Sequence, residues 1–147
     1  MISKKILILE EDLHLQWILK TFLESNGFSI IVSDTIEKVS EIISKVKVSI
    51  FITEYWVNHS HTLEIIKKMK ESSPQVYVLL NTNRIIGEKE YQQIINAGVD
   101  DLLEKPFSFD KMLIYLKKGS KKRSLITEKD RLEKDLPKSK PRIRASL

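Results

Sequence analysis

The chain has 147 residues, of which 41% are hydrophobic and 31% charged, and it contains no cysteine. That length and apolar content suffice for one domain with a buried core and are too small for two comfortable ones. The lack of cysteine excludes a disulfide framework and thiolate chemistry, and no apolar run approaches the roughly 20 residues that a membrane span needs. We therefore expect a soluble cytoplasmic protein with one folded domain and no membrane association.

The net charge of +5 is divided unevenly along the chain. Residues 117–147 carry 12 Lys and Arg against 4 Asp and Glu, whereas residues 1–116 carry 13 basic against 16 acidic side chains. The basic end has few large apolar residues and two prolines, a composition typical of a disordered segment or a fraying helix. We therefore predict a folded domain over residues 1–118 and a basic tail over residues 119–147.

The first predicted strand is the apolar run Lys5–Leu9, which is followed by three consecutive acids, Glu10, Glu11 and Asp12. Asp12 is suited to capping the next helix, where a carboxylate meets the positive end of the helix dipole. Clustered carboxylates also suit a hard divalent cation such as Mg²⁺. The residues alone leave both interpretations open.

Helix-like and strand-like patterns then alternate to the end of the predicted domain. Leu15, Leu19 and Phe22 recur at the spacing of one helix face, and short apolar runs separate such stripes. Five strand–helix units with mostly short connections predict a doubly wound parallel sheet, an α/β fold with helices on both faces. The later strands are expected at 28–32, 48–54, 76–80 and 99–104, and the later helices at 36–43, 63–69, 91–95 and 109–116. Ser33 or Asp34 is expected to cap the second helix. An irregular stretch is expected at 55–62 and a polar loop at 81–84.

The third predicted strand, Val48–Glu54, is mostly apolar and ends in a single carboxylate. Such a run is typical of a strand buried on both faces of a parallel sheet. Ligands of open α/β sheets bind beyond the carboxyl ends of the strands, so Glu54 marks the expected position of a site. His59 and His61 follow two residues apart, but a transition-metal site would need a third ligand, so we interpret them as solvent-exposed loop residues.

Two motifs give the chain a resemblance to a known family. The run Ile6–Asp12 looks like an acidic-pair strand, and the run Ala97–Phe107 is similar to a closing signature in both order and spacing. With these motifs, residues 4–118 resemble the receiver domain of bacterial two-component response regulators. The resemblance implies a flavodoxin-like five-stranded sheet of order 2-1-3-4-5 and a role in phosphorelay signal transduction. It implies a protein partner, either a histidine kinase or a downstream effector, and leaves a homodimer open.

The resemblance also assigns an acidic pocket to this chain. Glu10 and Glu11 stand where the family has the acids that help to hold Mg²⁺, although the second of them is more often Asp. Glu54 stands where the family has its phosphate-accepting Asp, and no Asp lies between residues 34 and 100. Any Mg²⁺ would therefore be held by Glu10, Glu11 and Glu54.

The remaining positions of the family's site fall near the ends of the last two strands. Lys105 matches the lysine that contacts the phosphoryl group, and the Lys105–Pro106 bond is expected to be cis. The hydroxyl switch residue matches Thr82 by side-chain chemistry or Asn83 by spacing, and we choose Thr82. The aromatic switch residue is replaced by Leu102.

Glu54 changes the function that the resemblance implies. Its extra methylene moves the carboxylate outward by roughly 1 Å, and a misplacement of about that size can lower a rate on the order of a hundredfold. We therefore interpret the chain as an atypical receiver, not an enzyme, that binds a protein partner independently of phosphorylation. The alternatives are a phosphorylatable regulator that uses Mg²⁺ and nucleic-acid association through the basic tail, for which we favour a solvated tail instead.

Overall fold

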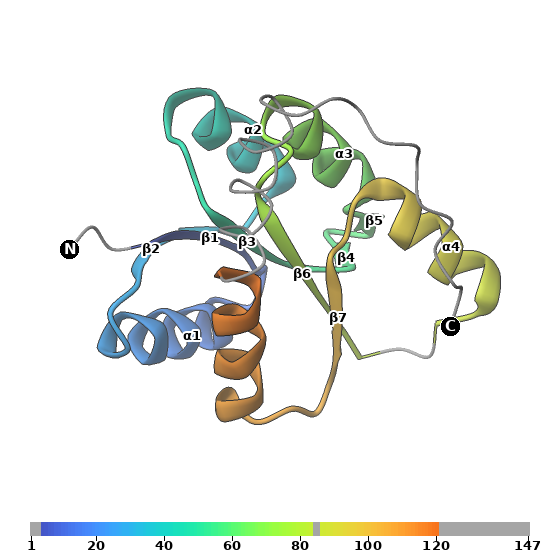
Figure 1. Ribbon diagram of the computed structural model, residues 1–147. Coiled ribbons are helices and arrows are strands. Elements are labelled where there is room, and N and C mark those ends of the chain that lie inside the picture. Colours follow the sequence, from blue (N-terminus) through green and yellow to red (C-terminus); the bar gives the residue numbers. More distant parts are fainter. Residues whose placement is uncertain (1–3, 84–85, 121–147) are drawn as a thin grey trace, which may run out of the picture.

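The computed structural model describes residues 4–83 and 86–120, and its centre is one sheet of five parallel strands (Figure 1). The strands lie in the order β2-β1-β3-β6-β7, and a separate two-residue pair, β4 and β5, forms a small hairpin. Counted without the hairpin, this order is 2-1-3-4-5, so the predicted flavodoxin-like topology is confirmed. The bounds are β1 Lys5–Leu9, β2 Ser29–Ser33, β3 Ile50–Glu54, β4 Trp56–Val57, β5 Ser60–His61, β6 Tyr77–Thr82 and β7 Asp101–Glu104.

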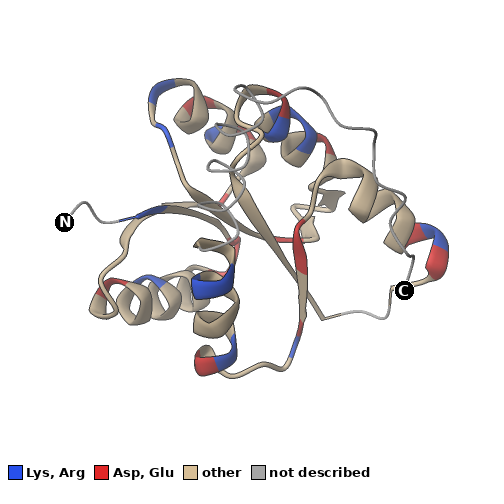
Figure 2. Ribbon diagram, viewed as in Figure 1, with Lys and Arg blue, Asp and Glu red and all other residues tan. Residues whose placement is uncertain are grey.

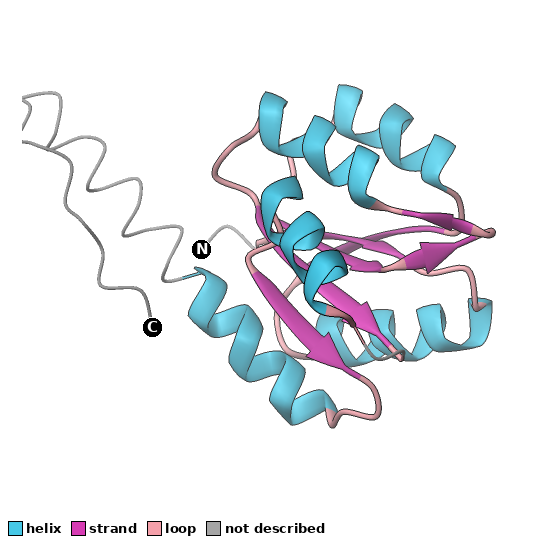
Figure 3. Ribbon diagram, turned by 90° about the vertical axis from the view of Figure 1, so that its right-hand side faces the viewer, coloured by secondary structure: helices cyan, strands magenta, loops and turns pink. Residues whose placement is uncertain are grey.

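Helices cover both faces of the sheet, as predicted, and Figure 3 shows the strands lying between two layers of helices. Figure 1 shows α2 and α3 above the sheet, and α1 with the last described helix below it. The helices are α1 Leu13–Ser25, α2 Ile36–Lys45, α3 Leu63–Ser72, α4 Glu88–Ala97 and a helix over residues 109–120. No helix in the described part of the chain combines the length and apolar character of a membrane span.

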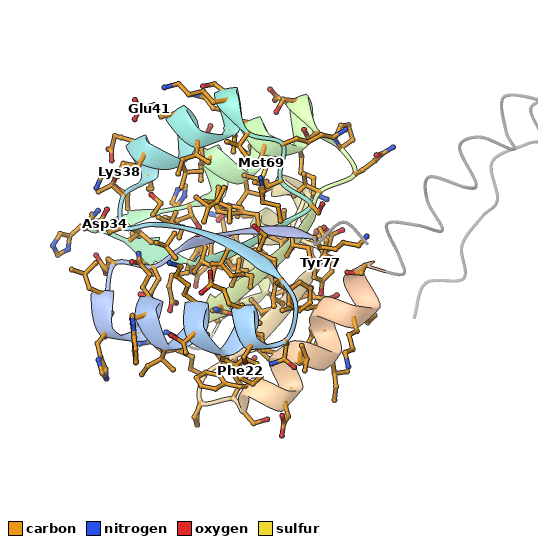
Figure 4. The ribbon with its side chains drawn as sticks, turned by 90° about the vertical axis from the view of Figure 1, so that its left-hand side faces the viewer. Phe22, Asp34, Lys38, Glu41, Met69 and Tyr77 are labelled. Carbon is orange, nitrogen blue, oxygen red and sulfur yellow. The ribbon has the colours of Figure 1, made fainter. Side chains whose placement is uncertain are left out.

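Side-chain alternation along the strands creates two apolar cores. In β1, Leu7 and Leu9 belong to the core under α2, α3 and α4, while Ile6 and Ile8 belong to the core under α1 and the last helix. Successive residues of a strand point to opposite faces, so a strand that is apolar throughout fills both cores. The last helix also packs on α1, because the ring centroids of Phe22 and Phe109 lie 5.0 Å apart. Figure 4 labels Phe22 and shows the two helices side by side.

Two helix starts show how far capping could be predicted. Asp12 caps α1 as expected, and its carboxylate accepts from the backbone nitrogens of His14 and Leu15 at 3.0 and 3.2 Å. The predicted cap of α2 was wrong, because Thr35 is the cap. Ser33 is still in β2, and Asp34 pairs instead with Lys38 at 2.8 Å, one helical turn away (Figure 4).

Two predicted loops contain strands. In the stretch 55–62 the chain makes the hairpin β4–β5, whose turn residues Asn58 and His59 have φ of +50° and +66°. β6 continues through Asn81 and Thr82, which were predicted to lie in a polar loop. Thr82 pairs with Glu104 of β7. β6 therefore extends two residues beyond its last apolar residue, Leu80, toward the predicted site.

The end of the last helix is fixed to the starts of β6 and β7. Lys118 Nζ lies 3.3 Å from a carboxylate oxygen of Asp101, and the Tyr77 hydroxyl donates to the other oxygen at 2.7 Å. Burial and this hydrogen bond raise the pKa of Tyr77, so the hydroxyl keeps its proton. Gly119 packs directly on the Tyr77 ring. Of the tail predicted over residues 119–147, residues 121–147 lie outside the described residues.

Candidate functional site

The candidate site is a polar pocket at the carboxyl end of the sheet. Glu10 follows β1, Glu54 ends β3, Thr82 ends β6 and Lys105 follows β7, so four neighbouring strands deliver these residues to one edge. The backbone nitrogen of Lys105 donates to the Thr82 carbonyl at 2.8 Å, which holds the last two strand ends together. The Lys105–Pro106 bond is cis, as the resemblance implied.

Lys105 and Glu54 form a direct ion pair in this pocket. The Lys105 ammonium donates to Glu54 Oε1, and only 12% of the Glu54 side chain and 25% of the Lys105 side chain is exposed. A charge-assisted contact that is shielded from water is stronger than an exposed surface pair. The pair thus places a fixed negative charge and its counterion at the end of β3.

Glu10 is the second carboxyl group of the pocket and is almost completely buried. Burial, and after it the hydrogen bond and negative charge of Glu54, raise the pKa of Glu10 to about 8, although the Asp12 amide and Lys105 act in the opposite direction. Lys105 Nζ lies 3.8 Å from Glu10 Oε1, and the Asp12 backbone nitrogen donates to Glu10 Oε2 at 3.1 Å. Near neutral pH, Glu10 therefore keeps its proton.

Glu11, the other member of the predicted acidic pair, is turned to the β4–β5 hairpin. Its Oε2 accepts from the backbone nitrogen of Asn58 at 2.9 Å, and the side chain is exposed. The hairpin is thus tied to the loop after β1. Glu10 and Glu11 are adjacent in sequence, but the structure brings only Glu10 to Glu54 and Lys105.

This arrangement does not fit the Mg²⁺ ion that the resemblance implies. A hard divalent cation needs several oxygen ligands around one point. Here the Lys105 ammonium contacts Glu54 and approaches Glu10, while Glu11 is bound to the hairpin. Among the described residues, no three acidic, His or Cys side chains gather as a metal site. Both Lys105 and Glu11 would have to move before the cation could be held.

The resemblance assigns two switch positions, Thr82 at the end of β6 and Leu102 in β7. Thr82 is buried, whereas Asn83, the alternative by spacing, is exposed. Leu102 pairs with Leu80 and packs against the core under α2, α3 and α4. A leucine in this position has no polar tip that could move between a buried and an exposed state.

Sequence reasoning missed two residues of the site. Asn58 binds Glu11 through its backbone, so no side-chain pattern could have identified it. Asn81 is the register partner of Glu54 and points to the same face of the sheet, because neighbours in register share a face. Its Oδ1 is buried and has no hydrogen-bond partner among the residues that the structure describes. The sequence signal that could have identified Asn81 was its position as a polar residue directly after the apolar run of a buried strand.

Comparisons with known proteins agree with the fold and with the family that the sequence resembles. The family model of the response regulator receiver domain matches residues 6–117. A putative response regulator NtrX-like of Rickettsia typhi is 31% identical over 122 residues, which cover 78% of this chain and 24% of that protein. The transcriptional regulatory protein CrdR of Helicobacter pylori is 26% identical over 121 residues, which cover 79% of this chain and 54% of CrdR. The chain thus spans between a quarter and about half of these curated relatives.

Solved structures show the same fold. A CheY-like response regulator receiver domain protein from Methanospirillum hungatei superposes with a TM-score of 0.79 at 19% identity, over 84% of this chain and 98% of that one. NtrX from Brucella abortus, solved in complex with ADP, superposes with a TM-score of 0.78 at 17% identity, over 90% of this chain and 30% of that one. At these identities the likeness concerns the fold alone.

Proposed function

Because the chain belongs to the response regulator receiver family, we propose that it acts in two-component signalling as an atypical receiver that is not phosphorylated. It works by binding a protein, either a histidine kinase or a downstream effector, and catalyses no reaction of its own. The observation that carries this proposal is the ion pair between Glu54 and Lys105. It provides permanently, from the chain's own side chains, a charge contact at the position where the family places its phosphoryl group.

The geometry of phosphoryl transfer supports the proposal. The reaction depends on positioning of the acceptor, a metal ion and a cationic side chain around the phosphoryl group. In this pocket the acceptor position carries the longer acid, and its oxygen is already bound by Lys105. An attack would require this ion pair to open in a site that is largely shielded from water.

The proposed docking surface lies on α4 and β7. Tyr91 and Ile95 are one turn apart on α4, and 48% and 45% of these side chains are exposed. Large exposed apolar side chains in a pair are typical anchors of protein interfaces. Leu102, on β7, stands where the family has its aromatic switch residue. Because leucine replaces the mobile aromatic ring, this surface keeps one shape. A partner would then recognise the chain without a prior signal.

Incubation of the full chain with acetyl phosphate and Mg²⁺, followed by intact mass measurement, tests the proposal. We expect no added phosphoryl group, because the Glu54 carboxylate is misplaced and bound. Glu54→Asp is the matched variant, since it restores the shorter acid. A gain of one phosphoryl group on the unaltered chain that is lost in Glu54→Gln would overturn the proposal and establish the phosphorylatable alternative.

A further inference from the structure

Lysine side chains gather at the amino end of the sheet, opposite the acidic pocket. In a doubly wound fold the strands start and the helices finish at this end, so residues from distant parts of the sequence meet there. Figure 2 shows basic positions at the start of β1, around the end of α2, on α3 and near the end of the last helix. The residues are Lys4, Lys5, Lys45, Lys47, Lys68, Lys70, Lys117 and Lys118.

Most of this positive charge is not neutralised within the described part of the chain. Asp100 and Asp101 lie at the same end, but Lys70 and Lys118 pair with them at 2.8 and 3.3 Å. Within the described residues, the other six lysines have no carboxylate within 4.0 Å, so their ammonium groups are available to a ligand. The acids that remain exposed nearby are Glu24, Glu71 and Glu41, which lies one turn before Lys45 on α2.

A hollow lies within the lysine-rich end, between the ends of α2 and α3. It has a volume of about 280 Å³, and its polar lining consists of two lysines and three serines, over a floor of apolar side chains. The Ser44 and Ser72 hydroxyls donate to backbone carbonyls of their own helices, so the ammonium groups of the two lysines are the main donors for phosphate oxygens. The polar residues are Ser44, Lys45, Lys47, Ser72 and Ser73.

The surroundings favour a nucleic-acid backbone over a lipid surface as the source of the phosphates. A membrane-binding surface adds apolar side chains that enter the lipid. The exposed large apolar residues of the described chain lie on α1, β4, α4 and the last helix, and none lies on α2 or α3. The absence of an aromatic ring at the hollow also excludes base stacking, so contacts would be to phosphates only.

The basic end of the sequence begins at the same place. Gly119 packs on Tyr77, the first residue of β6, so residue 120 lies at the amino end of the sheet. The segment 117–147 contains 12 basic and 4 acidic residues. At the far end, the exposed acids Glu11, Asp12 and Glu104 would repel a polyanion and orient the domain.

We propose that the amino end of the sheet, with Lys45 and Lys47 at its hollow, binds the phosphate backbone of nucleic acid without reading its sequence. This inference does not depend on the phosphorylation state of the pocket. It differs from binding through the basic tail alone, because it requires the folded domain to contribute contacts.

Fluorescence anisotropy with a labelled DNA duplex of about 20 base pairs tests the proposal on the full chain, between about 50 and 200 mM salt. We expect Lys45→Glu/Lys47→Glu to weaken binding at least about tenfold at the lower salt. The slope of log K against log salt should become shallower by roughly 2, because each lost phosphate contact removes about 0.9. Lys45→Arg/Lys47→Arg should retain binding.

The matched control is Lys89→Glu/Lys111→Glu, which changes the net charge equally at the opposite end of the domain. Both control lysines are exposed. We expect this variant to bind within about twofold of the unaltered chain, and circular dichroism checks that all variants fold. The proposal is overturned by no binding at about 50 mM salt, by equal effects of the two double variants, or by full binding of Lys45→Glu/Lys47→Glu, which would assign binding to the tail. Binding to anionic vesicles in place of the duplex would overturn it too.

Discussion

At the scale of single residues, Glu10 differs from an ordinary glutamate because its surroundings keep it protonated. It is buried beside Glu54, and Lys105 is too far from it to form a normal hydrogen bond. A carboxyl group that shares a site with another carboxylate cannot ionise until a high pH is reached. The proton on Glu10 is therefore part of the folded structure.

The raised pKa of Glu10 predicts how the free energy of unfolding depends on pH. Folded Glu10 releases its proton near pH 8, whereas an unperturbed glutamate does so near 4.5. Between these values the unfolded chain binds fewer protons than the folded chain, so the free energy of unfolding falls as the pH rises through the window and levels off above it. Urea denaturation at a series of pH values should show a steeper fall for the unaltered chain than for Glu10→Gln, by up to about 1.4 kcal/mol per pH unit. Parallel curves for the two proteins would contradict this assignment.

At the scale of elements, the last helix is docked through a glycine. A Cβ atom added to Gly119 would lie 2.5 Å from Cγ and Cδ2 of the Tyr77 ring, closer than such atoms approach. Tyr77 is buried and its hydroxyl is held by Asp101, so the ring has little freedom to move aside. The close packing of helix on strand therefore depends on the missing side chain.

Gly119→Ala should destabilise the domain. Overpacking of this kind costs about 1–3 kcal/mol, and the better helix propensity of alanine returns at most about 1 kcal/mol. Thermal unfolding should show a lower Tm, while Lys117→Ala, on the exposed side of the same helix, should leave the Tm nearly unchanged. A Gly119→Ala protein as stable as the unaltered chain would mean that the helix end is not held against Tyr77.

The elements that could be predicted from the sequence are those with apolar periodicity. The runs that became β1 and β3 are apolar because each fills two cores, and their ends located Glu10 and Glu54. Lys105 was located by the run Ala97–Phe107, which is similar to the closing signature of the family. The hairpin at Trp56–His61 could not be predicted, because its strands have two residues each and its turn lacks glycine.

The contacts of the site were less predictable than its members. The polar residues Asn81 and Thr82 looked like a loop, because strand pairing with β3 and β7 is not visible in the local sequence. Adjacent Glu10 and Glu11 separate for a similar reason, since Glu11 binds a backbone nitrogen 47 positions away. Which carboxylate enters the pocket is thus decided by tertiary structure.

At the scale of the whole molecule, the two ends of the sheet carry opposite charge. The acids of the strand ends lie at one end, and lysines at the starts of strands and the ends of helices lie at the other. Helix C-termini favour nearby cations, which accounts for part of this pattern through Lys45 and Lys70 in the last turns of α2 and α3. The other lysines lie outside those turns, and together with Lys45 they form the proposed nucleic-acid surface.

The Tm of the whole domain can test whether the acidic pocket binds Mg²⁺. A ligand that binds only the folded state raises the Tm, and at 100 times its Kd it adds about 2.7 kcal/mol. We expect MgCl₂ at about 10 mM to shift the Tm no more than NaCl of equal ionic strength, because Lys105 and Glu11 are otherwise bound. A Tm increase of several degrees specific to Mg²⁺, with a saturable change in the fluorescence of Trp56, would show that the pocket rearranges around the ion.

The pairing of Glu54 with Lys105 has a consequence for how such a module could be controlled. A charge that is built into the chain is present from the moment of folding and cannot be removed by a phosphatase. The strength of the response would then follow the number of copies in the cell, set by synthesis and degradation. Regulation would lie in gene expression and turnover, with no chemical donor to supply or withhold.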